Sequence, residues 1–304
     1  MKNDVMRKDI CEIRNGCEFE SFHPAVSFIY FSAVIAFSMV FMHPVCLIIS
    51  AACATAYSII LKGRKAVFFN LFFLIPVILT TAFINPAFNH EGVTIITYLP
   101  SGNPLTAESV FYGIAAGTML ASVICWFSCF NVVMTSDKFV WLFGRITPAL
   151  SLVLAMSLRF VPRFKSQLLK VCESQRNIGR DISDGGIIKR GKCAVTILSI
   201  MVTWALENAI ETADSMKSRG YGSGKRTSFS IYRLGKRDKI TLCFMAILIV
   251  YILVSLKFGG MYFRYFPSVR QNPPGLYGVS AFAAYFALCI MPVIIECTEA
   301  RKWK

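Results

Sequence analysis

Residue types that commonly perform chemistry are present in this sequence, but their spacing assembles no catalytic or metal site. The eleven cysteines are scattered without a Cys-x-x-Cys pair, and most lie in apolar runs, where cysteine behaves as a small hydrophobe. The three histidines, His23, His43 and His90, are isolated, and two of them directly precede a proline. We therefore expect no metal, no cofactor and no disulfide framework.

A glycine-rich run from Gly220 to Thr227 is the nearest approach to a nucleotide-binding loop. A P-loop requires Gly-x-x-x-x-Gly-Lys-Ser/Thr after a strand. Here the glycine spacing differs, Arg226 stands at the Ser/Thr position, and a helix end precedes the run. A flexible C-terminal cap is the better interpretation. Glu207 and Glu211 lie one turn apart and are interpreted as a solvated helix face, so we expect that the chain is not an enzyme.

Two segments place arginine and glycine where an amphipathic helix pattern stops. Their candidate docking residues are Gln175, Arg176, Gly179 and Arg180 in the first, and Ser218, Arg219 and Gly220 in the second. The last carbonyls of a helix carry partial negative charge, and a following glycine lets the chain turn sharply. An exposed guanidinium can then pair with a partner's carboxylate. An ordinary charged helix end is the alternative for either segment alone, but two copies favour docking.

The apolar periodicity predicts the two helices that carry these segments. Apolar residues at three-to-four spacing predict one amphipathic helix that begins near Pro162 and ends by Gly179. A second helix is predicted from about Ala194 to Arg219. Alanines 205, 209 and 213 are small residues four apart. Small residues permit close backbone approach, so we expect the two helices to cross there.

Outside this region the sequence is dominated by apolar runs. Charged residues make up 16% of the chain, against about 25% in soluble domains. Six runs without Lys, Arg, Asp or Glu approach the roughly 20 residues that span a bilayer; they cover residues 25–42, 44–61, 66–84, 109–134, 240–256 and 276–295. The predicted fold is an all-α integral membrane protein with about six transmembrane helices and long cytoplasmic helices. The sequence leaves open a seventh and eighth span through 147–161 and 194–206.

The distribution of basic residues predicts the orientation. Of the 32 Lys and Arg residues, 19 lie in region 138–239, whereas 85–108 contains none. Because basic residues collect on the cytoplasmic side, we expect both termini in the cytoplasm of a bacterial-type plasma membrane. Loop 257–275 is the exception, with three basic residues. Positive-inside topology and anionic lipid headgroups explain the net charge of +15 without a nucleic-acid partner.

The same patterns divide the chain into four parts and constrain its energy source. The parts are a cytoplasmic lead-in (1–22), a four-span block (23–134), a cytoplasmic two-helix module (135–239), and two spans with a cytoplasmic tail (240–304). Ion-driven transporters usually need ionisable groups inside the bilayer. None of the six runs has one in its middle, so any transport would be energised by another chain.

The order of these features resembles the transmembrane T component of energy-coupling factor (ECF) transporters, the EcfT/CbiQ-like family. That family carries two short Ala-Arg-Gly motifs at the ends of two cytoplasmic coupling helices. The second motif is similar to Ser218-Arg219-Gly220, with serine for alanine. The first resembles 174–179, where Ile178 replaces the signature arginine and either Arg176 or Arg180 could take its role. Stretches His23-Pro24 and 135–164 also resemble the family.

The resemblance implies a scaffold with defined partners. Two ATP-binding-cassette (ABC) ATPase subunits would bind the coupling helices, and a separate S component would bind the vitamin or metal ion. ATP-driven closure would move the helices and reorient the S component in the bilayer. Two other functions are weighed against this one. A self-sufficient permease of a conventional ABC importer would need its own translocation path, and a membrane lipid enzyme would need clustered acid–base residues.

Overall fold

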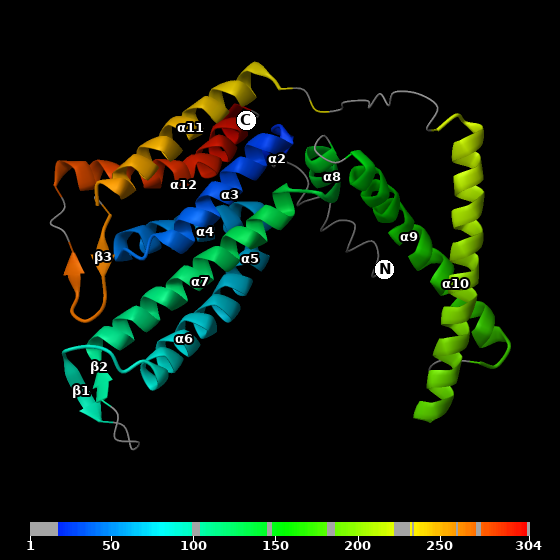
Figure 1. Cartoon of the computed structure of the whole chain (residues 1–304), viewed down its shortest axis with the longest axis horizontal. Helices are drawn as coiled ribbons and strands as arrows, with labels where there is room; N and C mark the ends of the chain where they lie inside the picture. Colours follow the sequence, from blue (N-terminus) through cyan, green and yellow to red (C-terminus); the bar gives the residue numbers. More distant parts are fainter. Residues whose placement is uncertain are drawn as a thin grey trace. The chain divides into compact units, whose positions relative to one another are not determined.

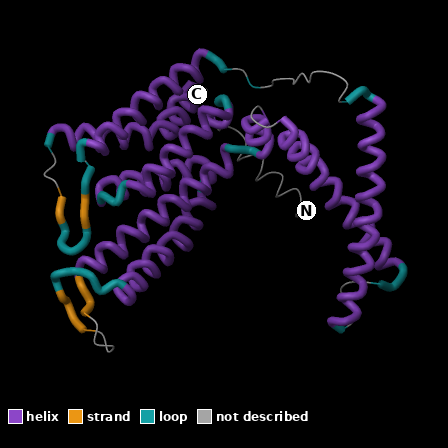
Figure 2. The backbone as a smooth tube through the Cα atoms, in the orientation of Figure 1, coloured by secondary structure: helices purple, strands orange, loops and turns teal. Residues whose placement is uncertain are grey.

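The computed structural model describes residues 18–98, 104–144, 148–180, 186–221, 232, 234–259, 261–271 and 275–302, and these are mostly helical (Figures 1 and 2). The elements are α2 (Glu18–Ser21), α3 (Pro24–Val40), α4 (Pro44–Lys62), α5 (Arg64–Phe69), a π-helix η1 (Asn70–Leu74), α6 (Ile75–Phe88), β1 (Ile95–Tyr98), β2 (Pro104–Thr106), α7 (Ala107–Val133), α8 (Ser136–Gly144), α9 (Pro148–Asn177), α10 (Ile187–Ser218), α11 (Lys236–Lys257), β3 (Phe263–Arg264), β4 (Arg270–Gln271) and α12 (Leu276–Lys302). The prediction of an all-α fold is confirmed.

The chain divides into two compact units, which we describe separately. The bundle unit comprises residues 1–138 and 232–304, and the helix-pair unit comprises 139–231. Two short antiparallel hairpins, β1–β2 and β3–β4, lie between helices of the bundle unit.

The helices are long and apolar enough for a multi-pass membrane protein. Six stretches could span a bilayer by length and composition: α4, Ala66–Phe88, α7, α10, α11 and Tyr277–Thr298. Five of them match predicted spans. The first predicted span forms α3, an apolar helix of 17 residues, at the short end of the roughly 17–25 residues that span a bilayer. The one stretch that matches none of the six predicted spans, α10, contains residues 194–206, where the sequence left a further span open.

Two His-Pro pairs begin the first two long helices. His23 and His43 are the N-cap residues of α3 and α4, and each Nδ1 accepts a hydrogen bond at 3.2 Å, from the backbone N–H of Ala25 and Val45 respectively. Proline suits the first helical turn because its missing N–H would have no helical partner there. Burial lowers the pKa of both imidazoles, and the nearby carboxylate of Asp238 opposes that effect at His23.

These caps predict a pH-dependent stability. Histidine in an unfolded chain titrates near pH 6.5. Because the folded pKa is lower, the unfolded state binds more protons, and stability is full above about pH 6.5 and is lost as the pH falls below it. We expect the midpoint temperature of thermal unfolding in detergent to decrease as the pH is lowered from 7 to 5. A His23→Asn/His43→Asn double variant, which replaces each capping nitrogen with an amide oxygen that does not titrate in this range, should flatten the profile; an unaltered profile would contradict this assignment.

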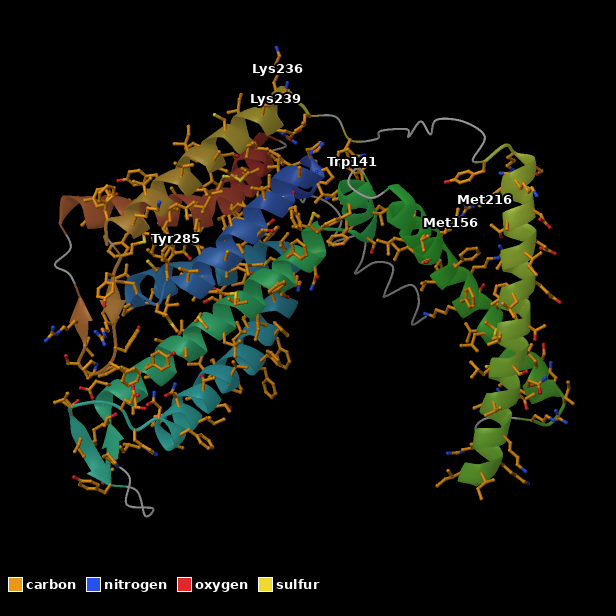
Figure 3. The ribbon with its side chains drawn as sticks, viewed as in Figure 1. Trp141, Met156, Met216, Lys236, Lys239 and Tyr285 are labelled. Carbon is orange, nitrogen blue, oxygen red and sulfur yellow. The ribbon has the colours of Figure 1, made fainter. Side chains whose placement is uncertain are left out.

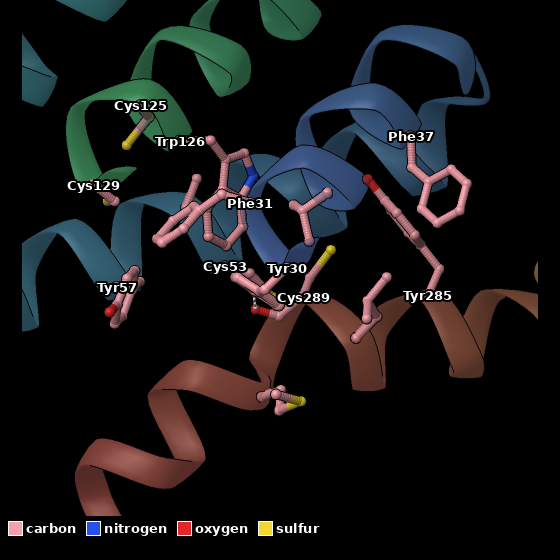
Figure 4. Close-up of a cluster of buried hydrophobic side chains, with 14 of the residues drawn as sticks. Tyr30, Phe31, Phe37, Cys53, Tyr57, Cys125, Trp126, Cys129, Tyr285 and Cys289 are labelled. Atoms are coloured by element: carbon pink, nitrogen blue, oxygen red, sulfur yellow. Dashed lines mark hydrogen bonds between the residues drawn. The ribbon is translucent and has the colours of Figure 1, made fainter. Parts of the chain in front are cut away.

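Aromatic side chains form the core of the bundle unit (Figure 4). Trp126 of α7 is fully buried, and its ring lies 6.1 Å from Tyr30, 6.3 Å from Phe31 and 6.4 Å from Tyr57, measured between ring centroids. These neighbours belong to α3 and α4, so the cluster packs three helices together.

A chain of polar side chains crosses the same core. Trp126 Nε1 donates to Ser50 Oγ at 3.1 Å, and Ser50 Oγ lies 2.7 Å from Ser38 Oγ. Ser38 Oγ lies 3.3 Å from the hydroxyl of Tyr285, which extends the chain into α12. Tyr30 donates to the carbonyl of Cys289 at 3.1 Å. Polar groups left unpaired in hydrocarbon are costly, so this network links α3, α4, α7 and α12 in one arrangement.

Candidate functional site

The end of α9 is a complete glycine cap. Gly179 has a left-handed backbone with φ of +78°, and its N–H donates to the carbonyl of Arg176 at 2.9 Å. The N–H of Arg180 donates to the carbonyl of Gln175, also at 2.9 Å. This pair of bonds is a Schellman motif, in which glycine relieves the strain that a side chain would meet.

The end of α10 repeats that geometry. Gly220 has φ of +73°, and its N–H donates to the carbonyl of Lys217 at 3.0 Å. The N–H of Tyr221 donates to the carbonyl of Met216 at 3.0 Å. Both segments singled out in the sequence therefore end in the same backbone structure, which we call the first cap (175–180) and the second cap (216–221).

The shared backbone aligns the two caps residue by residue. Arg219 occupies the last position before the glycine in the second cap, and Ile178 occupies it in the first. Arg176 corresponds to Lys217, and Arg180 corresponds to Tyr221. The predicted docking residues are thus divided between two ends, with only the second cap placing an arginine directly before its glycine. Which arginine serves the first cap stays open.

The glycine of the second cap gives a testable contrast. A left-handed backbone costs a residue with a Cβ about 1–2 kcal/mol, so Gly220→Ala should loosen the last turn of α10. Gly191 lies inside α10, where a Cβ would meet no atom within 4 Å. Gly191→Ala should therefore stabilise the helix by about 0.5–1 kcal/mol. Amide hydrogen exchange should become faster around the second cap in the first variant and slower near Gly191 in the second; equal effects would contradict the cap.

Two expected helix starts are wrong. Pro162 lies inside α9, which begins 14 residues earlier at Pro148. The intervening stretch is rich in alanine, leucine and methionine, whose helix propensity outweighs the local cost of one internal proline. Helix α10 begins at Ile187 rather than Ala194 and continues through Gly191. A single internal glycine costs only about 1 kcal/mol, and the packing that follows offsets it.

The two helices also cross at a different place from the one expected. Val171 of α9 packs with Cys193, Ile197 and Met201 of α10, whereas Ala209 and Ala213 are exposed. The helices run in opposite directions around a short connection, so the residues nearest that connection meet first. Cys193 Sγ also donates to the carbonyl of Arg180 at 3.1 Å, which ties the exit of the first cap to α10.

Beyond the crossing, a cleft separates α9 from α10. An edge-to-face pair, Phe164 with Trp204, joins the two helices beside the cleft, with ring centroids 5.3 Å apart. A cleft of about 630 Å³ follows; α9 lines it with Met156, Arg159, Phe160, Pro162 and Arg163, and α10 with Asn208, Glu211, Thr212, Ser215, Met216 and Arg219. Met156 and Met216 are labelled on the two helices in Figure 3. The second cap therefore borders an open cleft.

The structure gives less support to the other candidate residues that the sequence offered. Glu207 and Glu211 are both exposed on α10, and Glu211 lines the cleft. Most of the glycine-rich run, 222–227, lies outside the described residues. Within the described part of the chain, no three His, Cys, Asp or Glu side chains form a metal-binding group. Sequence reasoning missed Arg159 and Arg163 as site residues, although their one-turn spacing is visible beside Pro162.

This architecture defines a class: multi-pass all-α membrane proteins that carry an antiparallel pair of long, glycine-capped helices. The CbiQ family, described as cobalt transport protein, matches residues 22–231. The chain belongs to this family, the transmembrane T components of energy-coupling factor transporters.

Several relatives share the description "energy-coupling factor transporter transmembrane protein EcfT". The Lactobacillus helveticus protein is 39% identical over 106 residues, which is 34% of this chain and 38% of that protein. The Staphylococcus aureus protein is 36% identical over 113 residues, covering 37% and 42% respectively. The Bacillus selenitireducens protein is 24% identical over 197 residues, covering 61% and 73%. The chain thus matches about two-fifths of the length of the first two relatives.

Proposed function

We propose that this chain is the scaffold of an ECF-type importer and transmits the movement of two ABC ATPase subunits to a separate S component. The observation that carries the proposal is the repeated cap at the ends of α9 and α10. Two equal backbone structures, each beside basic side chains, suit two similar partner surfaces. ATP hydrolysis belongs to those partners, and this chain is a non-catalytic subunit.

The separation of the caps supports one ATPase at each. Cys193 contacts the first cap through Arg180, and Arg219 lies 26 residues further along α10. At 1.5 Å per residue this is roughly 39 Å along one stiff helix. Two ATPase subunits that close on ATP would therefore pull on separate points of the helix pair.

The exposed apolar face of α10 supports the second half of the proposal. Its large apolar residues at helical spacing are exposed; they are Val195, Leu198, Val202, Leu206 and Ile210. Exposed apolar patches of this extent mark contact with a protein partner or a membrane. We assign this face to the S component, which would bind the vitamin or metal ion.

The proposal includes the orientation and division of the chain. The cytoplasm holds both caps, the lead-in 1–22 and the tail after 295. The plasma membrane holds the spans of the four-span block and the last two spans. The basic residues of 138–239 support this arrangement through the positive-inside rule and anionic lipid headgroups. The module 135–239 carries the coupling helices between the four-span block 23–134 and the last two spans, 240–304.

Affinity purification of the tagged full chain from its native membrane tests the proposal. Mass spectrometry should find two ABC ATPase subunits and one small membrane protein for each copy of this chain. The purified complex should bind substrate only when that small protein is present. Substrate binding by this chain alone would instead support a self-sufficient permease of a conventional ABC importer.

A further inference from the structure

We infer that the cleft between α9 and α10 receives an acidic segment of the ATPase partner that binds the second cap. This inference rests on the proposed function and specifies the chemistry of one of its two docking points. It adds Arg159 and Arg163 of α9 to the recognition surface, so that residues of both α9 and α10 form the second docking site.

The charges that line the cleft are unbalanced. Arg159, Arg163 and Arg219 contribute three guanidinium groups, and Glu211 contributes one carboxylate. Within the described residues, neither Arg159 nor Arg219 forms an ion pair. Arg159 and Arg163 stand four residues apart on one helix face, a spacing at which like charges repel. Two partner carboxylates would neutralise the remaining charge and could bind the guanidinium forks in bidentate geometry.

The remaining lining indicates that the occupant also has apolar side chains. Met156, Phe160 and Met216 line the same cleft, and its volume of about 630 Å³ accommodates several side chains. Methionine adapts to irregular surfaces, which suits contact with a moving partner. The guanidinium of Arg163 lies 5.8 Å from the ring centroid of Trp204, so the aromatic contact at the closed end orients it.

The two docking points are consequently unequal. The first cap exits beside the crossing, where Cys193 holds the carbonyl of Arg180. The second cap opens onto the cleft through Met216 and Arg219. An ATPase with an acidic and apolar segment is selected at the second cap, so the two ATPase positions differ in their sequence requirements.

Retention of the ATPases by the full chain tests the inference, measured by quantitative pull-down at increasing salt. The double variant Arg159→Gln/Arg163→Gln should retain the second-cap ATPase about tenfold less, with a weaker salt dependence. Its matched control is Lys165→Gln/Lys170→Gln, which removes two exposed cations of α9 outside the cleft and should change nothing.

A single variant with the opposite sign separates the effect from misfolding. Glu211→Gln removes the one acidic group of the cleft and should raise retention about threefold, whereas Glu207→Gln, one turn away and outside the cleft, should not. If Arg159→Gln/Arg163→Gln and Glu211→Gln both retain the ATPase as the unmodified chain does, while Arg219→Glu loses it, this inference is overturned and the proposed function stands. Loss of phosphatidylglycerol binding in Arg159→Gln/Arg163→Gln, with normal ATPase retention, would assign the cleft to lipid and also overturn it.

Discussion

Replacing Arg219 with glutamate is expected to abolish ATP-driven uptake while the membrane bundle stays folded. Arg219 directly precedes Gly220 in the second cap and lines the cleft. Breaking a hydrogen-bonded charge pair at an interface costs about 2–5 kcal/mol because the partner's carboxylate is left unpaired. The introduced carboxylate also lies beside the partially negative end of α10. Affinity for the second-cap ATPase should therefore fall at least about thirtyfold in a pull-down from membranes.

A charge reversal elsewhere on the same helix controls for net charge. Lys189 is exposed in the first turn of α10, where a carboxylate is favourable. Lys189→Glu should retain both ATPases and transport normally. Normal uptake by Arg219→Glu, at the expression level of the unmodified chain, would remove the docking role of the second cap.

Substituting Gly117 with valine is expected to have the largest effect on stability. Gly117 of α7 faces α6 so closely that an added Cβ would lie 2.9 Å from the Cα of Ile78 and would overlap the hydroxyl of Thr81. A backbone atom cannot move aside without separating the two helices. Overpacking a tight contact costs about 1–3 kcal/mol, and we expect the upper end or more because backbone is involved.

The measurement is the midpoint of thermal unfolding of the purified chain in detergent. Gly113→Ala should be milder, because alanine adds only a Cβ, which would lie 3.1 Å from the Cα of Ala82, so the two helices would need to separate by only a few tenths of an ångström. Leu120→Val introduces the same β-branched residue at an exposed position of α7 and should have little effect. An unaltered midpoint for Gly117→Val would show that α6 and α7 do not meet at this glycine.

The sequence was sufficient to predict the elements whose signals are local. Apolar runs without charge predicted the helices of the bundle, and the ends of α4 and α7 lie within two residues of those of their predicted spans. Glycine after a polar helix end predicted both caps, because few other residues adopt a positive φ without strain. The two caps align position by position, with Ile178 and Arg219 each directly before the glycine.

The errors came from features that depend on packing. Pro162 and Ala194 were expected to lie near the starts of the two helices, but neighbouring helix formers carry α9 through Pro162, and α10 begins earlier, at Ile187. Small residues at 205–213 suggested a crossing, yet the crossing is fixed by the larger side chains near the connection, Ile197 and Met201. The network from Trp126 to Tyr285 joins residues far apart in the chain, so no local pattern could reveal it.

The central claim is that both caps contact ABC ATPases inside the cell, and photo-crosslinking in living cells tests it most directly. A benzophenone amino acid placed at Ile178 reports on the first cap, and one placed at Tyr221 reports on the second; both side chains are exposed. Irradiation should produce one covalent adduct with an ABC ATPase from each position, and the adducts should be identified by mass spectrometry. Adducts confined to lipid or to proteins outside the cytoplasm, at either cap, would contradict the account.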